Sequence, residues 1–153
     1  MWQQPPNHDG IPLVVQLNNP LRIPYTEGHG HIGVLSVEDG LFHFSDHLYG
    51  ARSVYRVLDR CVATGRSKTY QIVAAVFGGS PQEVHSNSLR VAERCVGGID
   101  EDHTHEGMSP EDRSLVRMCL AGSLTRLATG GWSLPPAVWI QAAGLLDKRE
   151  VLG

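Results

Sequence analysis

The chain lacks the hydrophobic segments that mark membrane and secreted proteins. Its 153 residues contain no apolar run of about eighteen residues, the length that a membrane-spanning helix needs. The N-terminus does not show a basic stretch followed by an apolar one, which is the pattern of a secretory signal. We therefore expect no membrane span, and a protein that is made in the cytoplasm and folds as one compact domain.

Basic residues are few and scattered along the chain. Lys and Arg number 13 against 16 Asp and Glu, which gives a formal net charge of −3 at pH 7. A nucleic-acid-binding protein needs a sustained basic face that neutralises phosphates. The sequence therefore argues against a nucleic-acid partner.

Cysteine is also scarce. The chain has three widely spaced cysteines, Cys61, Cys95 and Cys119, and each falls on the apolar side of an expected helix. An odd number of cysteines cannot all pair within one chain. We expect buried free thiols in a protein made in a reducing cytoplasm, rather than disulfides.

The densest polar segment, residues 100–106, is a candidate metal site. His103, His105 and the neighbouring carboxylates could gather a divalent metal. A closed site also needs a second pair of ligands at a fixed helical spacing, and the sequence offers none. We therefore expect a solvated acidic loop, with no metal or other cofactor. Two further histidine pairs are expected to be loop or surface histidines: His29 with His31, and His43 with His47.

The segment Gly28-His29-Gly30-His31-Ile32-Gly33 matches the G-x-G-x-x-G fingerprint of dinucleotide-binding proteins. In those proteins the glycines follow a buried strand and open a helix. Here Pro20 and Pro24 interrupt the preceding segment, and a hairpin follows. We expect a glycine-rich loop that lets two backbones approach closely, and no nucleotide site.

The strongest structural signal is that hairpin. Asp39-Gly40 is a favoured two-residue turn, because both positions tolerate positive φ. It joins two expected strands, residues 34–37 and 41–44. Upstream, the β-branched residues 11–17 are expected to form a short strand or extended edge, which Asn18-Asn19-Pro20 ends.

A helix is expected directly after the hairpin. Ser45 is its expected N-cap, Asp46 should lie against the positive helix end, and Gly65 is the expected C′ residue. Apolar residues at three- and four-residue spacing predict further helices, at residues 67–77, 81–97, 109–129 and 135–146. The helix at 109–129 is the most apolar, so it is expected to be central and buried.

Two of these helices have recognisable starts. Ser80 and Glu83 form a capping box around Pro81, so the expected role of Glu83 is capping rather than catalysis. Ser133 is expected to cap the last helix. The fold class is therefore α+β, mainly α, with about five helices, a small β-hairpin and an extended N-terminal arm. We expect the arm to cover residues 1–17 and the domain to cover residues 18–153.

Several segments carry a resemblance to a known family. They are Asn18-Asn19-Pro20, Arg22-Ile23-Pro24-Tyr25, the glycines Gly30 and Gly33, Phe42-His43-Phe44-Ser45, and Tyr49-Gly50-Ala51-Arg52. With these segments the chain resembles a family of small lysozyme-like proteins of phages and prophages, usually described as virion structural proteins. That family is similar to the muralytic nucleocapsid protein of enveloped double-stranded RNA phages. The resemblance extends over roughly residues 18–147.

The resemblance implies a lysozyme-like fold and an ancestral activity on the glycan strands of peptidoglycan. Such cleavage needs a carboxylic acid that protonates the leaving oxygen. Family members commonly carry a His-Glu pair near the end of the penultimate helix, whereas this chain has Leu127-Ala128-Thr129-Gly130 there. If activity survives, the candidate acids are Glu83, Glu27 and Glu106. The candidate substrate-binding residues are Asn18, Asn19, Tyr25 and Tyr49.

The resemblance and the missing acid lead to three functional hypotheses. The first is a virion structural protein that has lost catalysis and contacts other capsid, core or tail proteins after synthesis in the bacterial cytoplasm. The alternative is a virion-associated glycosidase or lytic transglycosylase that degrades peptidoglycan locally during entry. The third is a glycan-binding module without turnover. A carboxylate buried in a cleft that faces Asn18 and Asn19 would favour the second.

Overall fold

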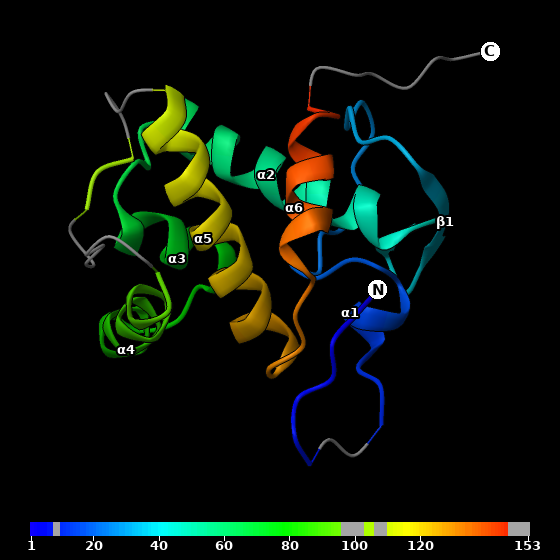
Figure 1. Ribbon diagram of the computed structural model, residues 1–153, viewed down its shortest axis with the longest axis horizontal. Coiled ribbons are helices and arrows are strands. Elements are labelled where there is room, and N and C mark those ends of the chain that lie inside the picture. The colour runs from blue at the N-terminus through cyan, green and yellow to red at the C-terminus, as the bar shows by residue number, and fades with distance from the viewer. Residues whose placement is uncertain (8–9, 96–102, 106–109, 147–153) are drawn as a thin grey trace.

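The part of the chain that the structure describes is mainly helical, with one small hairpin (Figure 1). The computed structural model describes residues 1–7, 10–95, 103–105 and 110–146. These residues form two strands and six helices: α1 (Leu13–Gln16), β1 (Val34–Glu38), β2 (Leu41–Phe44), α2 (His47–Ala63), α3 (Thr69–Phe77), α4 (Pro81–Glu93), α5 (Pro110–Thr129) and α6 (Pro136–Ala143). The expected fold class, α+β and mainly α, is confirmed.

The hairpin forms as predicted. β1 and β2 pair in antiparallel register, with Glu38 opposite Leu41, and the turn residues Asp39 and Gly40 have φ of 53° and 75°. Positive φ at both positions is the geometry of a type I′ turn. Phe42 and Phe44 of β2 are fully buried. The hairpin therefore anchors its second strand in the protein interior.

α2 is the central helix, because it packs against α3, α5, α6 and β2. The expectation that α5 would be central is wrong. Its apolar side chains do not all face inward: Leu120 and Leu124 are buried, but Leu115 is 57% exposed. α5 instead lies beside α2, between α4 and α6 (Figure 1).

The two ends of α2 show what local sequence signals determine. Asp46, and not Ser45, is the N-cap, because its carboxylate accepts a hydrogen bond from the backbone N–H of Leu48 at 2.8 Å. The prediction for Ser45 was therefore wrong by one residue. At the other end the prediction is confirmed: Gly65 follows the C-cap Thr64 and has φ of +84°.

The other caps gave mixed results. The capping box at α4 is confirmed, since Ser80 Oγ accepts from the Glu83 N–H and Glu83 Oε1 accepts from the Ser80 N–H, both at 3.2 Å. α4 ends at Glu93, earlier than expected. Ser133 does not cap α6, because Pro135 is the N-cap and offers no side-chain acceptor.

The strand expected at residues 11–17 is wrong, because Leu13–Gln16 forms the single-turn helix α1. Pro12 precedes its first residue, and the Pro12 carbonyl accepts from the N–H groups of Val15 and Gln16. Val14 and Val15 are buried in a small cluster with Trp132. This tertiary packing outweighs the preference of β-branched residues for strands.

The N-cap assignment can be tested by paired substitutions. Asp46→Ala should lower the free energy of unfolding by about 1 kcal/mol, because the Leu48 N–H loses its acceptor. Ser45→Ala should change it by less than about 0.5 kcal/mol. Urea unfolding of both variants measures the difference. Equal losses, or a larger loss for Ser45→Ala, would contradict the assignment.

Candidate functional site

A cleft lies where the segment before the hairpin meets the end of α5. Its volume is about 520 Å³, and we call it the α5 cleft. One wall comes from α1 and the residues after it, the other from α3, α4 and α5. The described lining residues are Pro12, Leu13, Val14, Pro20, Leu21, Arg22, Val76, Phe77, Asn87, Leu127 and Ala128. The cleft thus faces the Asn18-Asn19-Pro20 segment that carries the family resemblance.

Asn19 holds this segment in place. Its side chain is fully buried, and its Nδ2 donates to the carbonyls of Ile23 and Phe42, both at 2.9 Å. Its Oδ1 accepts from the Ile23 N–H at 2.8 Å. Both N–H groups of the carboxamide and its oxygen are therefore used within the chain.

Asn18 is used in a similar way. Its Nδ2 donates to the Phe44 carbonyl at 3.1 Å, and its Oδ1 accepts from the Trp2 indole N–H at 3.2 Å. A Cβ on Gly50 would lie 2.0 Å from the Asn18 carbonyl oxygen, so only glycine fits there. Asn18 and Asn19, two of the candidate substrate-binding residues, therefore have their side-chain amides bound to other parts of the chain.

The two candidate tyrosines lie elsewhere. Tyr25 is exposed, and its ring packs against Phe42 and His29 with centroid distances of 5.6 and 6.3 Å. Tyr49 lies against Gly33, where a Cβ would come within 2.2 Å of the ring. Neither tyrosine is among the described residues that line the α5 cleft. The structure does not bring the four candidates together in one site.

Neither Glu83 nor Glu27 is among the described residues that line the α5 cleft. Glu83 is exposed, and its carboxylate accepts the Ser80 N–H hydrogen bond of the α4 capping box. Glu27 lines a different groove, against α2. Glu106 lies outside the described residues. Of the described residues that line the cleft, none is an Asp or Glu.

The end of α5, residues 124–129, carries no carboxylate. Leu127 and Ala128 line the cleft with apolar atoms. The Thr129 hydroxyl is buried and donates within the chain, where the Thr125 carbonyl lies at 2.7 Å and the Trp132 carbonyl at 2.9 Å. Arg22 is the charged side chain among the described residues that line the cleft, and it is not a carboxylic acid.

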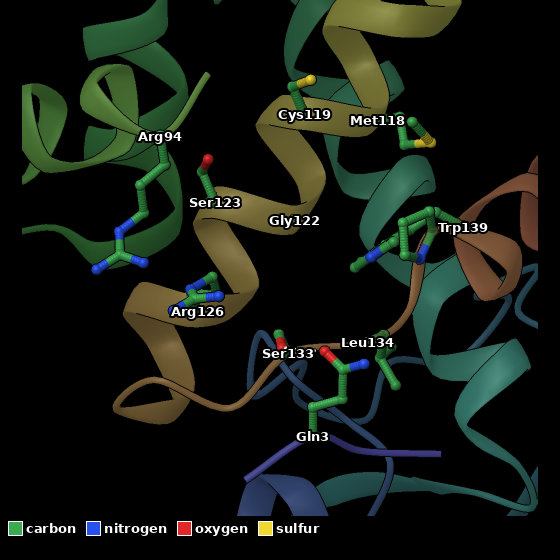
Figure 2. A pocket seen from close by; sticks show the side chains of 11 residues that line it. Gln3, Arg94, Met118, Cys119, Gly122, Ser123, Arg126, Ser133, Leu134 and Trp139 are labelled. Carbon is green, nitrogen blue, oxygen red and sulfur yellow. Dashed lines mark hydrogen bonds between the residues drawn. The ribbon is translucent and has the colours of Figure 1, made fainter. Parts of the chain in front are cut away.

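A second cavity, of about 480 Å³, is bordered on one side by Gln3 of the N-terminal segment (Figure 2). Gln3 and Ser133 exchange backbone hydrogen bonds of 2.8 and 3.2 Å, and the Ser133 hydroxyl donates to Gln3 Oε1. Figure 2 shows Arg94 and Arg126 on one side of the cavity and Trp139 on the other. Both arginines lie at helix C-termini, where a cation is favourable without any ligand.

Two loop histidines are buried, His31 and His105, so the expectation of a solvated loop is wrong at His105. His105 Nε2 lies 2.9 Å from Thr69 Oγ1, and its backbone N–H donates to the Ser67 carbonyl. Burial, with the neighbouring His103, lowers the pKa of His105 to about 4. Burial, His29 and nearby arginines lower the pKa of His31 to about 4. Both imidazoles are therefore neutral at pH 7.

The remaining candidate metal and thiol groups are dispersed. Within the described residues, no three His, Cys, Asp or Glu side chains lie close enough together to hold a metal ion. Cys61, Cys95 and Cys119 are free thiols. Cys61 is buried, whereas Cys95 and Cys119 are partly exposed. Burial raises the pKa of both Cys61 and Cys95.

The comparisons with known proteins leave the family open. No protein-family model matches the chain. No curated protein matches it either. Among the described helices, none is both long enough and apolar enough to span a bilayer.

The buried histidines predict a pH-dependent stability. Their pKa is near 6.5 in the unfolded chain and about 4 in the folded one, so below pH 6.5 the unfolded state binds more protons. The contribution of the neutral histidines to the free energy of unfolding is complete above pH 6.5. It is lost as the pH falls toward 4, by roughly 1 to 3 kcal/mol for each histidine. Urea unfolding at several pH values, followed by tryptophan fluorescence, measures this loss.

The control for this prediction is His31→Gln, which removes one of the two titrations. Its unfolding free energy should depend less on pH between 6.5 and 4 than that of the wild type. A variant with the same pH dependence as the wild type would contradict a lowered pKa at His31.

Proposed function

We propose that this protein is a phage or prophage virion structural protein, built on a lysozyme-like scaffold that has lost catalysis. The observation that carries the loss of catalysis is the α5 cleft, in which none of the described lining residues is an Asp or Glu. Glycosidic cleavage needs a carboxylic acid beside the leaving oxygen, typically worth about 10² to 10⁴ in rate. Leu127 and Ala128 lie where the resemblance places that acid.

The virion role is inferred from the family resemblance, and the surface offers a feature that suits contacts with neighbouring proteins. Within the described residues β1 pairs only with β2, so its other edge has no strand partner. Leu35 and Val37 of β1 are exposed. An open strand edge with apolar side chains is favourable for pairing with another chain. It supports a role in assembly with capsid, core or tail proteins.

The alternative is a peptidoglycan glycosidase that uses an acid from another place. One observation favours it: Glu27 and Asp59 both line a groove of about 660 Å³ between residues 23–31 and α2. Such enzymes usually use a pair of carboxyl groups for catalysis. However, Asp59 forms an ion pair with Arg117, which favours a structural role for this carboxylate.

The test is release of soluble fragments from purified peptidoglycan. We expect no release by the wild type at any pH between about 4 and 8, the range in which a carboxylic acid can be tuned for catalysis. An active lysozyme on the same material is the positive control, and circular dichroism shows that the protein is folded. Glu27→Gln, Glu83→Gln and Glu106→Gln are assayed in parallel.

Each outcome has a clear meaning. Release by the wild type that disappears in Glu27→Gln would contradict the proposal and establish the glycosidase. Release that disappears in Glu106→Gln would place the acid in that segment. Sedimentation of the protein with peptidoglycan, without release, would instead support a glycan-binding module.

A further inference from the structure

The groove between residues 23–31 and α2 lies beside a row of arginines. Arg52, Arg56 and Arg60 follow one another at four-residue intervals, so they lie on one face of α2. Arg52 is only 1% exposed, and its Nε donates to the Leu145 carbonyl at 2.9 Å. Arg56 and Arg60 line the groove, which has a volume of about 660 Å³. We call it the arginine groove.

Arg56 and Arg60 are not neutralised within the described chain. No ion pair or side-chain hydrogen bond joins either guanidinium to another described residue, whereas Arg117 pairs with Asp59. Like charges four residues apart on a helix repel each other. Burial and the neighbouring Arg56 both lower the pKa of Arg52. Arg56 and Arg60 are therefore two cations of the groove that have no acidic partner among the described residues.

The glycine-rich segment forms the opposite wall. Arg52 Nη1 lies 3.4 Å from the Gly30 carbonyl, and a Cβ on Gly30 would lie 2.9 Å from Arg56 Nη2. Gly30 therefore allows the loop to approach the arginine row more closely than a larger residue would. Of the three glycines that match the dinucleotide fingerprint, Gly30 and Gly33 lie against α2, whereas a Cβ on Gly28 would meet nothing within 4 Å.

His29 and His31 belong to that wall and line the groove. The His31 N–H donates to His29 Nδ1 at 2.9 Å, and the two rings are stacked with centroids 5.6 Å apart. His31 is 9% exposed, and its Nδ1 is buried without a hydrogen-bond partner in the described structure. A buried nitrogen without a partner is costly. A ligand oxygen that reached it would remove this cost.

The acidic residues of the groove do not cancel the arginines. Asp59 already pairs with Arg117 from α5. Glu27 is exposed and is the other carboxylate among the described lining residues. Arg56 and Arg60 therefore leave an excess of about one positive charge, which favours an anionic ligand.

We propose that the arginine groove binds a phosphorylated small molecule of about the size of a sugar phosphate, with its phosphate held by Arg56 and Arg60 beside His31. A planar guanidinium matches the phosphate oxygens in a bidentate geometry, which makes arginine the common choice for this ligand. A volume of about 660 Å³ falls in the range of small-molecule sites and exceeds what phosphate alone would fill. This inference does not depend on the loss of catalysis in the α5 cleft.

The test is titration calorimetry at pH 7 and low ionic strength with three probes: glucose 6-phosphate, inorganic phosphate and glucose. We expect saturable binding of glucose 6-phosphate, weaker binding of inorganic phosphate and none of glucose. Arg56→Gln and Arg60→Gln should each weaken glucose 6-phosphate binding at least about tenfold, because each removes a charged donor. Arg60 is exposed, so its variant should fold normally.

The matched control is Arg90→Gln, which makes the same change at an exposed position of α4 outside the groove. It should bind glucose 6-phosphate as the wild type does. No saturable binding at millimolar concentrations would overturn the proposal. Equal weakening by Arg90→Gln and Arg60→Gln would overturn it too, as would equal binding of glucose.

Discussion

The architecture depends on the buried carboxamide of Asn19. Two of its three hydrogen bonds hold Ile23 in the segment before the hairpin, and the third joins that segment to the Phe42 carbonyl of β2. β2 is thereby held where Phe42 and Phe44 enter the interior. Because α2 begins directly after β2, the same constraint positions the central helix and the arginine row on it. A buried carboxamide that lost these partners would cost free energy for each unpaired group.

This constraint also determines which surfaces are free to act. The polar side chains of Asn18 and Asn19 are bound to the chain itself, so the α5 cleft next to them presents mostly apolar atoms. The excess positive charge of Arg56 and Arg60 lies in the arginine groove, where the glycine-rich loop meets α2. This distribution suits the proposed contacts with partners and anions, and none of the described residues that line the α5 cleft is a carboxylic acid that could protonate a glycosidic oxygen.

Turns and helix caps could be predicted from the sequence, whereas burial and packing against distant residues could not. The Asp39-Gly40 turn, the Ser80 to Glu83 capping box and Gly65 were predicted because each depends on residues within one turn of the chain. The helix at Leu13–Gln16 and the burial of His31 and His105 depend on distant partners, so composition alone misassigned them. At the candidate sites the four-residue spacing of the arginines on α2 was missed, because the basic residues were described as scattered along the chain. The approach of these arginines to the glycine-rich loop could not be predicted, because no local pattern specifies a contact across more than twenty residues.

The measurement that tests this account most directly is the unfolding free energy of Asn19→Ala beside that of Asn87→Ala. The first leaves the Ile23 N–H without its acceptor and removes a donor from the Ile23 and Phe42 carbonyls, so it should cost about 2 to 4 kcal/mol and speed hydrogen exchange of the Ile23 amide. The second changes a partly exposed asparagine of α4 and should cost less than about 0.5 kcal/mol. Equal costs for the two variants would contradict the central place given to Asn19.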